Sequence, residues 1–314
     1  MQKSSATKSL RCRSKEKVEL TCAGFGKFSL SLSLCDNNDC SVPECGRWNL
    51  TDSVETLLVG GEADLESGSQ WPSLAVLFNV RRKTSCTVTI VSPRWLVTSH
   101  TCVHPGTPGS LNPLEWVVFA GPSGYSPTAS ESAQIKLVKS IVSHPGARRT
   151  QHLVDWDLAM VEIHDGLSFN TLVSPLCLAE TGVQERQLCV TAGWTSSSQG
   201  ISFNQYLTYL PVSQLPAQLC NSSSLYNGHL PSSGLCSKAN GDSRVCHTDL
   251  GSPLMCLTEG GQWQLQAVLS SRGDCPGSGS RVRPAVFTNV VLLRDWIYNT
   301  IGRTARGIRG QTEH

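Results

Sequence analysis

One stretch of the sequence decides how the rest of the chain is interpreted: Val245-Cys246-His247-Thr248-Asp249-Leu250-Gly251-Ser252-Pro253-Leu254. It places a cysteine, an aspartate and a glycine at short spacing before a Ser-Pro-Leu segment. Leu250 stands between the aspartate and the glycine, and its side chain has no hydroxyl to attack a carbonyl and no proton for a base to remove. We therefore ask which fold this pattern predicts, and whether the other chemical positions of that fold are altered too.

The composition favours an all-β protein with disulfides. The chain has 314 residues, and a single hydrophobic core stops growing near ~250–300 residues, so it can hold one large or two small cores. Charged residues make up 16%, and Gly, Pro and short apolar runs are frequent, which is typical of strands joined by many turns. A formal net charge of +2 gives no argument for nucleic acid as a partner. Fourteen cysteines indicate an oxidising compartment.

The sequence gives opposing signals for the cellular location. Sequons at Asn49 and Asn221 are compatible with glycosylation and secretion. Residues 1–8 lack the apolar core of a signal peptide, and no run of ~18 apolar residues is present to span a bilayer. We expect an extracellular or membrane-associated extracellular location, with an upstream signal or membrane segment missing from this fragment or isoform.

Further stretches occur in a fixed order before the first one. They are Cys86-Thr87-Val88-Thr89-Ile90-Val91-Ser92-Pro93-Arg94-Trp95-Leu96-Val97-Thr98-Ser99-His100-Thr101-Cys102, then Asp155-Trp156-Asp157-Leu158-Ala159, then Cys189-Val190-Thr191-Ala192-Gly193-Trp194. Together they resemble the signature segments of the trypsin-like (S1) serine proteases. The resemblance covers roughly residues 58–301. It implies two packed six-stranded antiparallel β-barrels, a C-terminal helix around residues 292–297, and an active site between the barrels.

The resemblance implies that the catalytic triad is degenerate. Thr101 stands in the slot of the catalytic histidine, and Leu250 in that of the nucleophilic serine. Asp157 is the triad member that remains, with Ser270 at the position that commonly hydrogen-bonds it in the family. His100 is the candidate substitute base, but adjacent residues on a helical turn point about 100° apart. We therefore expect its ring to point away from the cleft.

The substrate-binding positions also depart from the family pattern. Thr248 replaces the glycine whose N–H helps to form the oxyanion hole, and losing one such donor can cost ~10²–10³ in rate. Arg244 occupies the floor of the specificity pocket, where a cation would repel Lys or Arg substrates. Arg272 replaces the glycine of the pocket wall, where it can close the mouth or extend into solvent. Ser252, two residues from Leu250 along a sharp turn, should face elsewhere.

The activation site is altered as well. Leu58-Val59-Gly60-Gly61 resembles the Ile-Val-Gly-Gly at which family zymogens are cut, and residues 46–57 form a propeptide-like linker. Leu57 precedes the cut in place of the basic residue that a trypsin-like activator needs. Cleavage by an activator that prefers leucine is the alternative.

The two ends of the chain lie outside the protease-like region. Residues 1–45 resemble the stem of membrane-anchored serine proteases, as the tail of a scavenger-receptor cysteine-rich domain. Their cysteines lack paired C-x-x-C spacing and a nearby histidine, so we expect disulfides and no metal site. Residues 302–314 are polar and mildly basic, and we expect a disordered tail. The family pattern implies the disulfides Cys45–Cys177, Cys86–Cys102, Cys189–Cys256, Cys220–Cys236 and Cys246–Cys275, which leaves Cys12, Cys22, Cys35 and Cys40 to pair among themselves.

These departures predict a catalytically inactive serine protease homologue, a pseudoprotease that acts as a protein-binding or regulatory module without a cofactor. Loss of a single triad member typically costs ~10⁴–10⁶ in rate. An active protease, its inhibitor or its substrate is the expected kind of partner, and Arg244 with Arg272 weakly suggests an acidic peptide or anion. The alternatives are an active endopeptidase with a displaced His100/Asp157/Ser252 set and a splice product that folds poorly.

Overall fold

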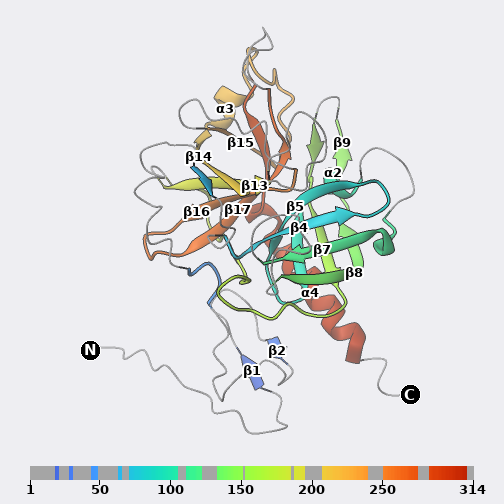
Figure 1. Ribbon diagram of the computed structural model, residues 1–314. Helices are drawn as coiled ribbons and strands as arrows, with labels where there is room; N and C mark the ends of the chain where they lie inside the picture. The colour runs from blue at the N-terminus through green and yellow to red at the C-terminus, as the bar shows by residue number, and fades with distance from the viewer. Residues whose placement is uncertain are drawn as a thin grey trace. The chain divides into compact units, whose positions relative to one another are not determined.

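The computed structural model (Figure 1) describes two compact units, residues Met1–Glu44 and Cys45–His314. In the first unit, β1 (Val18–Leu20) pairs antiparallel with β2 (Phe28–Leu30). The cysteines of this unit lie outside the described residues. The structure describes residues 18–20, 28–30, 44–48, 63–65, 71–104, 111–121, 133–150, 153–184, 187–194, 207–239, 250–274 and 283–309.

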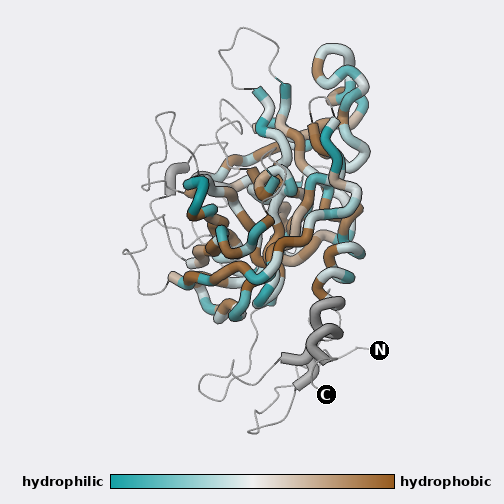
Figure 2. Tube along the Cα trace, turned by 90° about the vertical axis from the view of Figure 1, so that its right-hand side faces the viewer, coloured by the Kyte–Doolittle hydropathy of each residue, from teal (hydrophilic) through white to brown (hydrophobic). Residues whose placement is uncertain are grey.

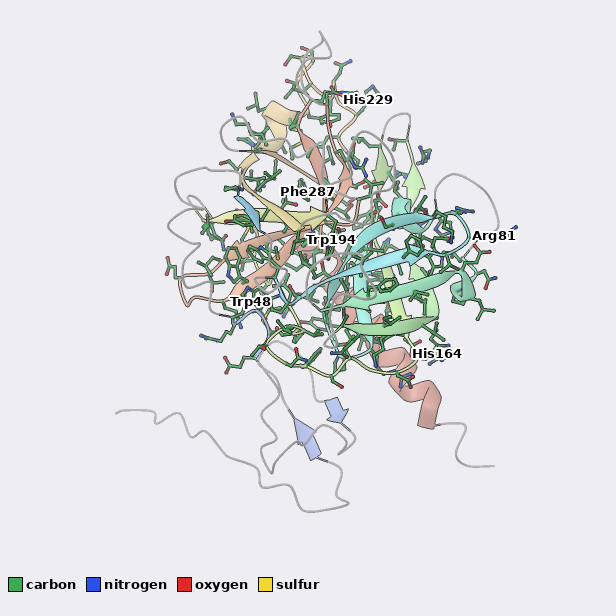
Figure 3. All side chains as sticks on the ribbon, in the orientation of Figure 1. Trp48, Arg81, His164, Trp194, His229 and Phe287 are labelled. Carbon is green, nitrogen blue, oxygen red and sulfur yellow. A yellow bond between two sulfur atoms is a disulfide. The ribbon has the colours of Figure 1, made fainter. Side chains whose placement is uncertain are left out.

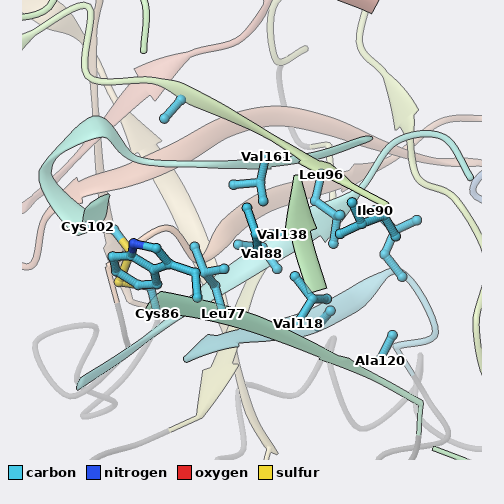
Figure 4. Close-up of a cluster of buried hydrophobic side chains, with 14 of the residues drawn as sticks. Leu77, Cys86, Val88, Ile90, Leu96, Cys102, Val118, Ala120, Val138 and Val161 are labelled. Atoms are coloured by element: carbon cyan, nitrogen blue, oxygen red, sulfur yellow. A yellow bond between two sulfur atoms is a disulfide. The ribbon is translucent and has the colours of Figure 1, made fainter. Parts of the chain in front are cut away.

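The first half of the second unit forms a closed barrel with the strand order β11-β6-β5-β4-β7-β8. Every neighbouring pair in it is antiparallel. Alternate side chains such as Leu77, Val88, Ile90, Val118 and Val161 are buried and fill the interior, as Figure 4 shows. The strands are β4 (Leu74–Asn79), β5 (Thr84–Ile90), β6 (Trp95–Thr98), β7 (Trp116–Ala120), β8 (Gln134–Ser143) and β11 (Ala159–Ile163).

The second half closes in the same way. The path β17-β16-β13-β14-β15-β18 returns on itself, because β18 also pairs with β17, and all of these pairs are antiparallel. Two short strands join from outside the ring, β3 (Ala63–Leu65) on β14 and β12 (Cys177–Leu178) on β17. The ring strands are β13 (Cys189–Trp194), β14 (Leu207–Leu215), β15 (Gly234–Ala239), β16 (Pro253–Leu257), β17 (Trp263–Ser271) and β18 (Ala285–Asn289). The all-β fold of two six-stranded antiparallel barrels is confirmed for the described residues.

Helices are short except at the C-terminal end. α4 (Arg294–Arg309) follows η5 (Val291–Leu293), and Leu293 and Ile297 are buried. The expected disordered tail, residues 302–314, is corrected in part, because α4 stays helical as far as Arg309. A helix that is already nucleated and packed extends at little cost, and Gly310 follows its last residue. The other short elements are α2 (His100–Val103), α3 (Ala217–Cys220), η3 (Pro113–Glu115), β9 (Arg148–Arg149) and β10 (Val154–Asp155).

Hydrophobic segments run mainly through the middle of the second unit, and hydrophilic segments lie mostly toward its edges (Figure 2). Within the described part of the chain, no helix is both long and apolar enough to cross a membrane.

Four of the expected disulfides form in the described residues: Cys45–Cys177, Cys86–Cys102, Cys189–Cys256 and Cys220–Cys236. Cys246 and Cys275 lie outside them. Residues 45–48 are fastened to the barrels by the first of these bridges and by Gly46, whose N–H donates to Pro175 O and whose carbonyl accepts from Trp263 N–H. Gly46 has φ +67°, and a Cβ there would lie 2.0 Å from Trp263 O, so only glycine fits. Cys45 thus belongs with the barrels.

Candidate active site

The turn after β6 fixes the position of Thr101. Ser99 caps α2, and its side chain accepts a hydrogen bond from the N–H of Cys102 at 3.2 Å. Cys102 is tied to Cys86 on β5 by a disulfide. The local sequence therefore holds Thr101 at the end of the first barrel, on the first turn of a capped helix.

Asp157, which lies just before β11, is fully buried and receives hydrogen bonds from both barrels. Thr101 donates its backbone N–H to Oδ1 and its hydroxyl to Oδ2, each at 2.7 Å. Ser270 of β17 donates its hydroxyl to Oδ2 at 2.5 Å. Burial raises the pKa of Asp157 above its ordinary value, although these hydrogen bonds act in the opposite direction. The structure therefore brings together Thr101, Asp157 and Ser270, three of the residues singled out from the sequence.

His100 makes its ring contact with another histidine, not with the aspartate. Its ring stacks on His104, with 4.2 Å between the centroids and 20° between the planes. In the described part of the chain, its Nδ1 atom is buried without a hydrogen-bond partner. Burial lowers the pKa of both imidazoles, and the nearby Arg149 guanidinium lowers the pKa of His100 further.

Ser252 is also separated from the aspartate. Its side chain is fully buried, and its hydroxyl donates to Thr87 Oγ1 of β5 at 3.3 Å. Gly193 of β13 lies against the same hydroxyl, and a Cβ there would come within 2.2 Å of the Ser252 Oγ. The hydroxyl is thus enclosed between the two barrels, and the structure does not assemble His100, Asp157 and Ser252.

The backbone around Leu250 is tightly held, and its side chain is partly exposed. Its carbonyl accepts a hydrogen bond from Thr87 N–H at 3.2 Å, and Gly251 N–H donates to Leu269 O at 3.0 Å. Gly251 has φ +84°, a conformation that L side chains rarely adopt. The sharp turn that presents residue 250 is therefore present, but the side chain at its tip is a leucine.

Only part of the predicted substrate-binding region is described. Arg272 follows the last residue of β17 and is partly buried. Thr248, Arg244, Leu57, Leu58 and Asn49 lie outside the described residues. Among the residues that are described, no group of three or more His, Cys, Asp or Glu side chains is placed to hold a metal ion.

Sequence reasoning missed a second buried carboxylate, Asp155. Ser233 donates its hydroxyl to Asp155 Oδ1 at 2.7 Å and its N–H at 3.2 Å, and Ser232 and the N–H of Trp156 donate as well. Burial opposes ionisation, but these hydrogen bonds outweigh it, so the pKa of Asp155 lies below its ordinary value. The serines are 77 and 78 residues away along the chain, and no local pattern could have indicated the contact.

Sequence reasoning also missed an ion pair close to Arg272, between Asp274 and Arg283. Arg283 binds Asp274 through two side-chain hydrogen bonds of 2.9 and 3.0 Å, and the N–H of Asp274 donates to Arg283 O. Gly273, with φ +73°, allows this close approach, since a Cβ there would lie 2.5 Å from Arg283 O. Asp274 and Arg283 are nine residues apart in the sequence, and no local pattern indicates that they pair.

Comparison with known proteins decides the family. The profile of the Trypsin family matches residues 59–297, most of the chain. The chain belongs to the trypsin family. It is 30% identical over 263 residues to Transmembrane protease serine 5 of Homo sapiens, which covers 82% of this chain and 53% of that protein.

Two other relatives agree. Transmembrane protease serine 9 of Rattus norvegicus is 30% identical over 262 residues, covering 83% of this chain and 23% of that protein. Transmembrane protease serine 11B of Homo sapiens is 27% identical over 263 residues, covering 82% and 59%. The chain therefore spans well under two thirds of the length of these relatives.

Proposed function

We propose that this trypsin-family chain is a catalytically inactive homologue that acts as a protein-binding or regulatory module. The observation that carries the proposal is the Thr101 hydroxyl on Asp157. In a working triad this carboxylate orients an imidazole and stabilises its charged form, whereas here the residue in the histidine position, Thr101, donates a hydroxyl to it at 2.7 Å. A threonine hydroxyl cannot accept a proton near neutral pH, and Leu250 has no atom for a base to activate.

A biotinylated fluorophosphonate, which labels activated serines, tests the proposal. We expect no labelling of the purified chain under conditions in which active trypsin is labelled completely. Labelling that disappears on Ser252→Ala would instead establish an active endopeptidase with the displaced His100/Asp157/Ser252 set. Thermal unfolding of the Ser252→Ala variant provides the control, because a folded variant that loses the label has lost the nucleophile itself.

An extracellular or membrane-associated extracellular location fits this role. Disulfides such as Cys189–Cys256 persist in oxidising compartments, and the relatives above are named transmembrane proteases. Asn221 is the described sequon, and its Oδ1 accepts a hydrogen bond from Leu230 N–H at 3.0 Å. We expect a glycan on its amide nitrogen. A mass shift on glycosidase treatment that is smaller in Asn221→Gln than in the unaltered chain would support it, and equal shifts would contradict it.

The expected partner of such a module is an active protease, its inhibitor or its substrate. Affinity capture from extracellular medium, followed by mass spectrometry of the retained proteins, tests that expectation. Capture of proteins from none of these three classes would contradict it.

A further inference from the structure

The first barrel carries an apolar outer face across two neighbouring strands. On β7 and β8, Val117 lies opposite Leu137 and Phe119 opposite Ile135. Directly opposite residues of an antiparallel pair project from the same face of the sheet. Leu137 is 64% exposed and Ile135 52%, while Val117 and Phe119 are partly exposed. We call these four residues the β7–β8 face.

A strongly basic turn borders this face. The apolar row continues onto β4, where Phe78 lies opposite Val117. Two residues later the chain enters the turn Val80-Arg81-Arg82-Lys83, which connects β4 to β5. Lys83 Nζ lies 6.0 Å from the centre of the Phe78 ring, so a cation is already placed beside the apolar row. We call residues 80–83 the basic turn.

Arg81 of the basic turn is accessible to a partner even though it is paired. Arg81 pairs with Glu115 at 3.1 Å, but its side chain is 78% exposed, and exposed pairs of this kind are weak and easily exchanged. Figure 3 shows Arg81 at the outer edge of the first barrel, where a partner can approach it. The apolar face therefore has a positive border.

Charge complementarity selects the kind of occupant. Exposed apolar patches with a polar border mark interaction sites on soluble proteins. A second copy of this chain is disfavoured, because a two-fold interface would bring the two basic turns to the same contact. An acidic segment fits better, since its apolar side chains would cover the face while its carboxylates pair with the basic turn.

We propose that the β7–β8 face and the basic turn form a docking site for an acidic segment of a partner protein that also carries apolar side chains. This inference rests on the proposed binding role and names the chemistry of the partner. It does not depend on whether Leu250 and Thr101 leave the former active site inert, because the proposed site lies on β7, β8 and the turn after β4.

Fluorescence anisotropy with designed peptides tests the site. The probe is a short fluorescein-labelled peptide in which Glu and Asp alternate with Leu and Phe, added to the full chain. One comparison peptide carries Lys in place of the acids, and another carries Ser in place of Leu and Phe. We expect saturable binding of the first peptide, weaker binding of the serine peptide and none of the lysine peptide. Affinity should fall as salt rises, because exposed charges are screened over about 10 Å at 0.1 M.

Matched variants locate the binding. Leu137→Ser should weaken binding about tenfold through lost apolar contact, while Leu292→Ser, at a site 54% exposed on η5, should leave it within about twofold. Lys83→Glu should weaken binding about fivefold or more at low salt, and Lys238→Glu, on β15 of the second barrel, should leave it unchanged. All of these sites are on the surface, so thermal unfolding should confirm that each variant is folded.

Several results would overturn the inference. They are the absence of saturable binding to the acidic peptide, equal weakening by Leu137→Ser and Leu292→Ser, and a dimer in sedimentation that Leu137→Ser dissociates. The last result would identify a second copy as the occupant. The fluorophosphonate assay is independent of all three. Labelled protein that still binds the peptide would refute the inactive homologue alone, and unlabelled protein without peptide binding would refute the docking site alone.

Discussion

Replacing Gly251 with alanine tests whether the turn that presents Leu250 is locked against the first barrel. Gly251 has φ +84°, and an added Cβ would lie 2.3 Å from the carbonyl oxygen of Thr87 and 2.2 Å from Thr98 Oγ1. The Thr87 oxygen belongs to backbone, and the Thr98 hydroxyl is itself held by a 2.9 Å hydrogen bond to that oxygen. Neither atom can move aside without disturbing β5 or β6.

The magnitude follows from two separate costs. An L residue in the left-handed conformation costs about 1–2 kcal/mol relative to glycine. Forcing an extra carbon into a packed site adds about 1–3 kcal/mol. Gly251→Ala should therefore lower the free energy of unfolding by about 2–5 kcal/mol. Gly228→Ala is the matched control, because Gly228 has φ +80° with nothing within 4 Å of an added Cβ. It should cost only the conformational part, about 1–2 kcal/mol.

Denaturant unfolding followed by tryptophan fluorescence measures both variants, and the chain contains eight tryptophans. We expect the unfolding midpoint of Gly251→Ala to fall well below that of Gly228→Ala at an unchanged m-value. Equal midpoints for the two variants would refute the reasoning, because they would show that the turn around Leu250 does not press against β5 and β6.

Three further predictions concern the former catalytic residues and their neighbours. Leu250→Ser should restore no peptidase activity, because Thr101 still supplies no base; turnover of a fluorogenic peptide by this variant would show that the base has been misassigned. Near pH 7, Asp155→Asn should lower the free energy of unfolding by about 1–3 kcal/mol. The pKa of Asp155 is lowered in the folded chain, so its ionised form stabilises the fold at pH values above its pKa in the unfolded chain. This stabilisation is lost as the pH falls through its pKa in the folded chain. Asp157→Asn should lower the free energy of unfolding by less than about 1 kcal/mol. The raised pKa of Asp157 means that the folded chain favours the neutral carboxyl, and this contribution to stability is lost as the pH rises through the folded pKa. Chemical denaturation compares the two variants, and an equal loss of stability would contradict the prediction. Burial lowers the pKa of His144 below 6.5, so the unfolded chain binds more protons in acid than the folded chain. The contribution of His144 to stability should therefore be fully present above pH 6.5 and decline below it. Denaturation midpoints measured over a pH series should decline less steeply for His144→Phe.

The sequence predicts the features that leave a local pattern, such as alternating apolar residues, and those that lie in segments resembling the family. Alternating apolar residues such as Val88 and Ile90 indicate barrel strands, and the family resemblance implies the bridges that form among the described residues. The neighbours Thr101 and Asp157 were predicted through the family resemblance. By contrast, alternation alone does not say which face of a strand is covered, so the exposed Leu137 looks the same as a core residue. Contacts such as that of Ser233 with Asp155 depend on how the two barrels meet, which no short pattern encodes.

The presence of Asp157 is explained without catalysis. The capped turn aims the N–H of Thr101 at a buried point, and this donor needs an acceptor there whatever the chemistry of the site. Removing the acceptor would leave the N–H unsatisfied, at a cost of about 1–3 kcal/mol. The hydroxyls of Thr101 and Ser270 converge on the same carboxylate from the two barrels, so Asp157 joins them as a structural residue. An aspartate at this position is therefore no evidence for a working triad, and the case for or against activity depends on the side chains at positions 101 and 250.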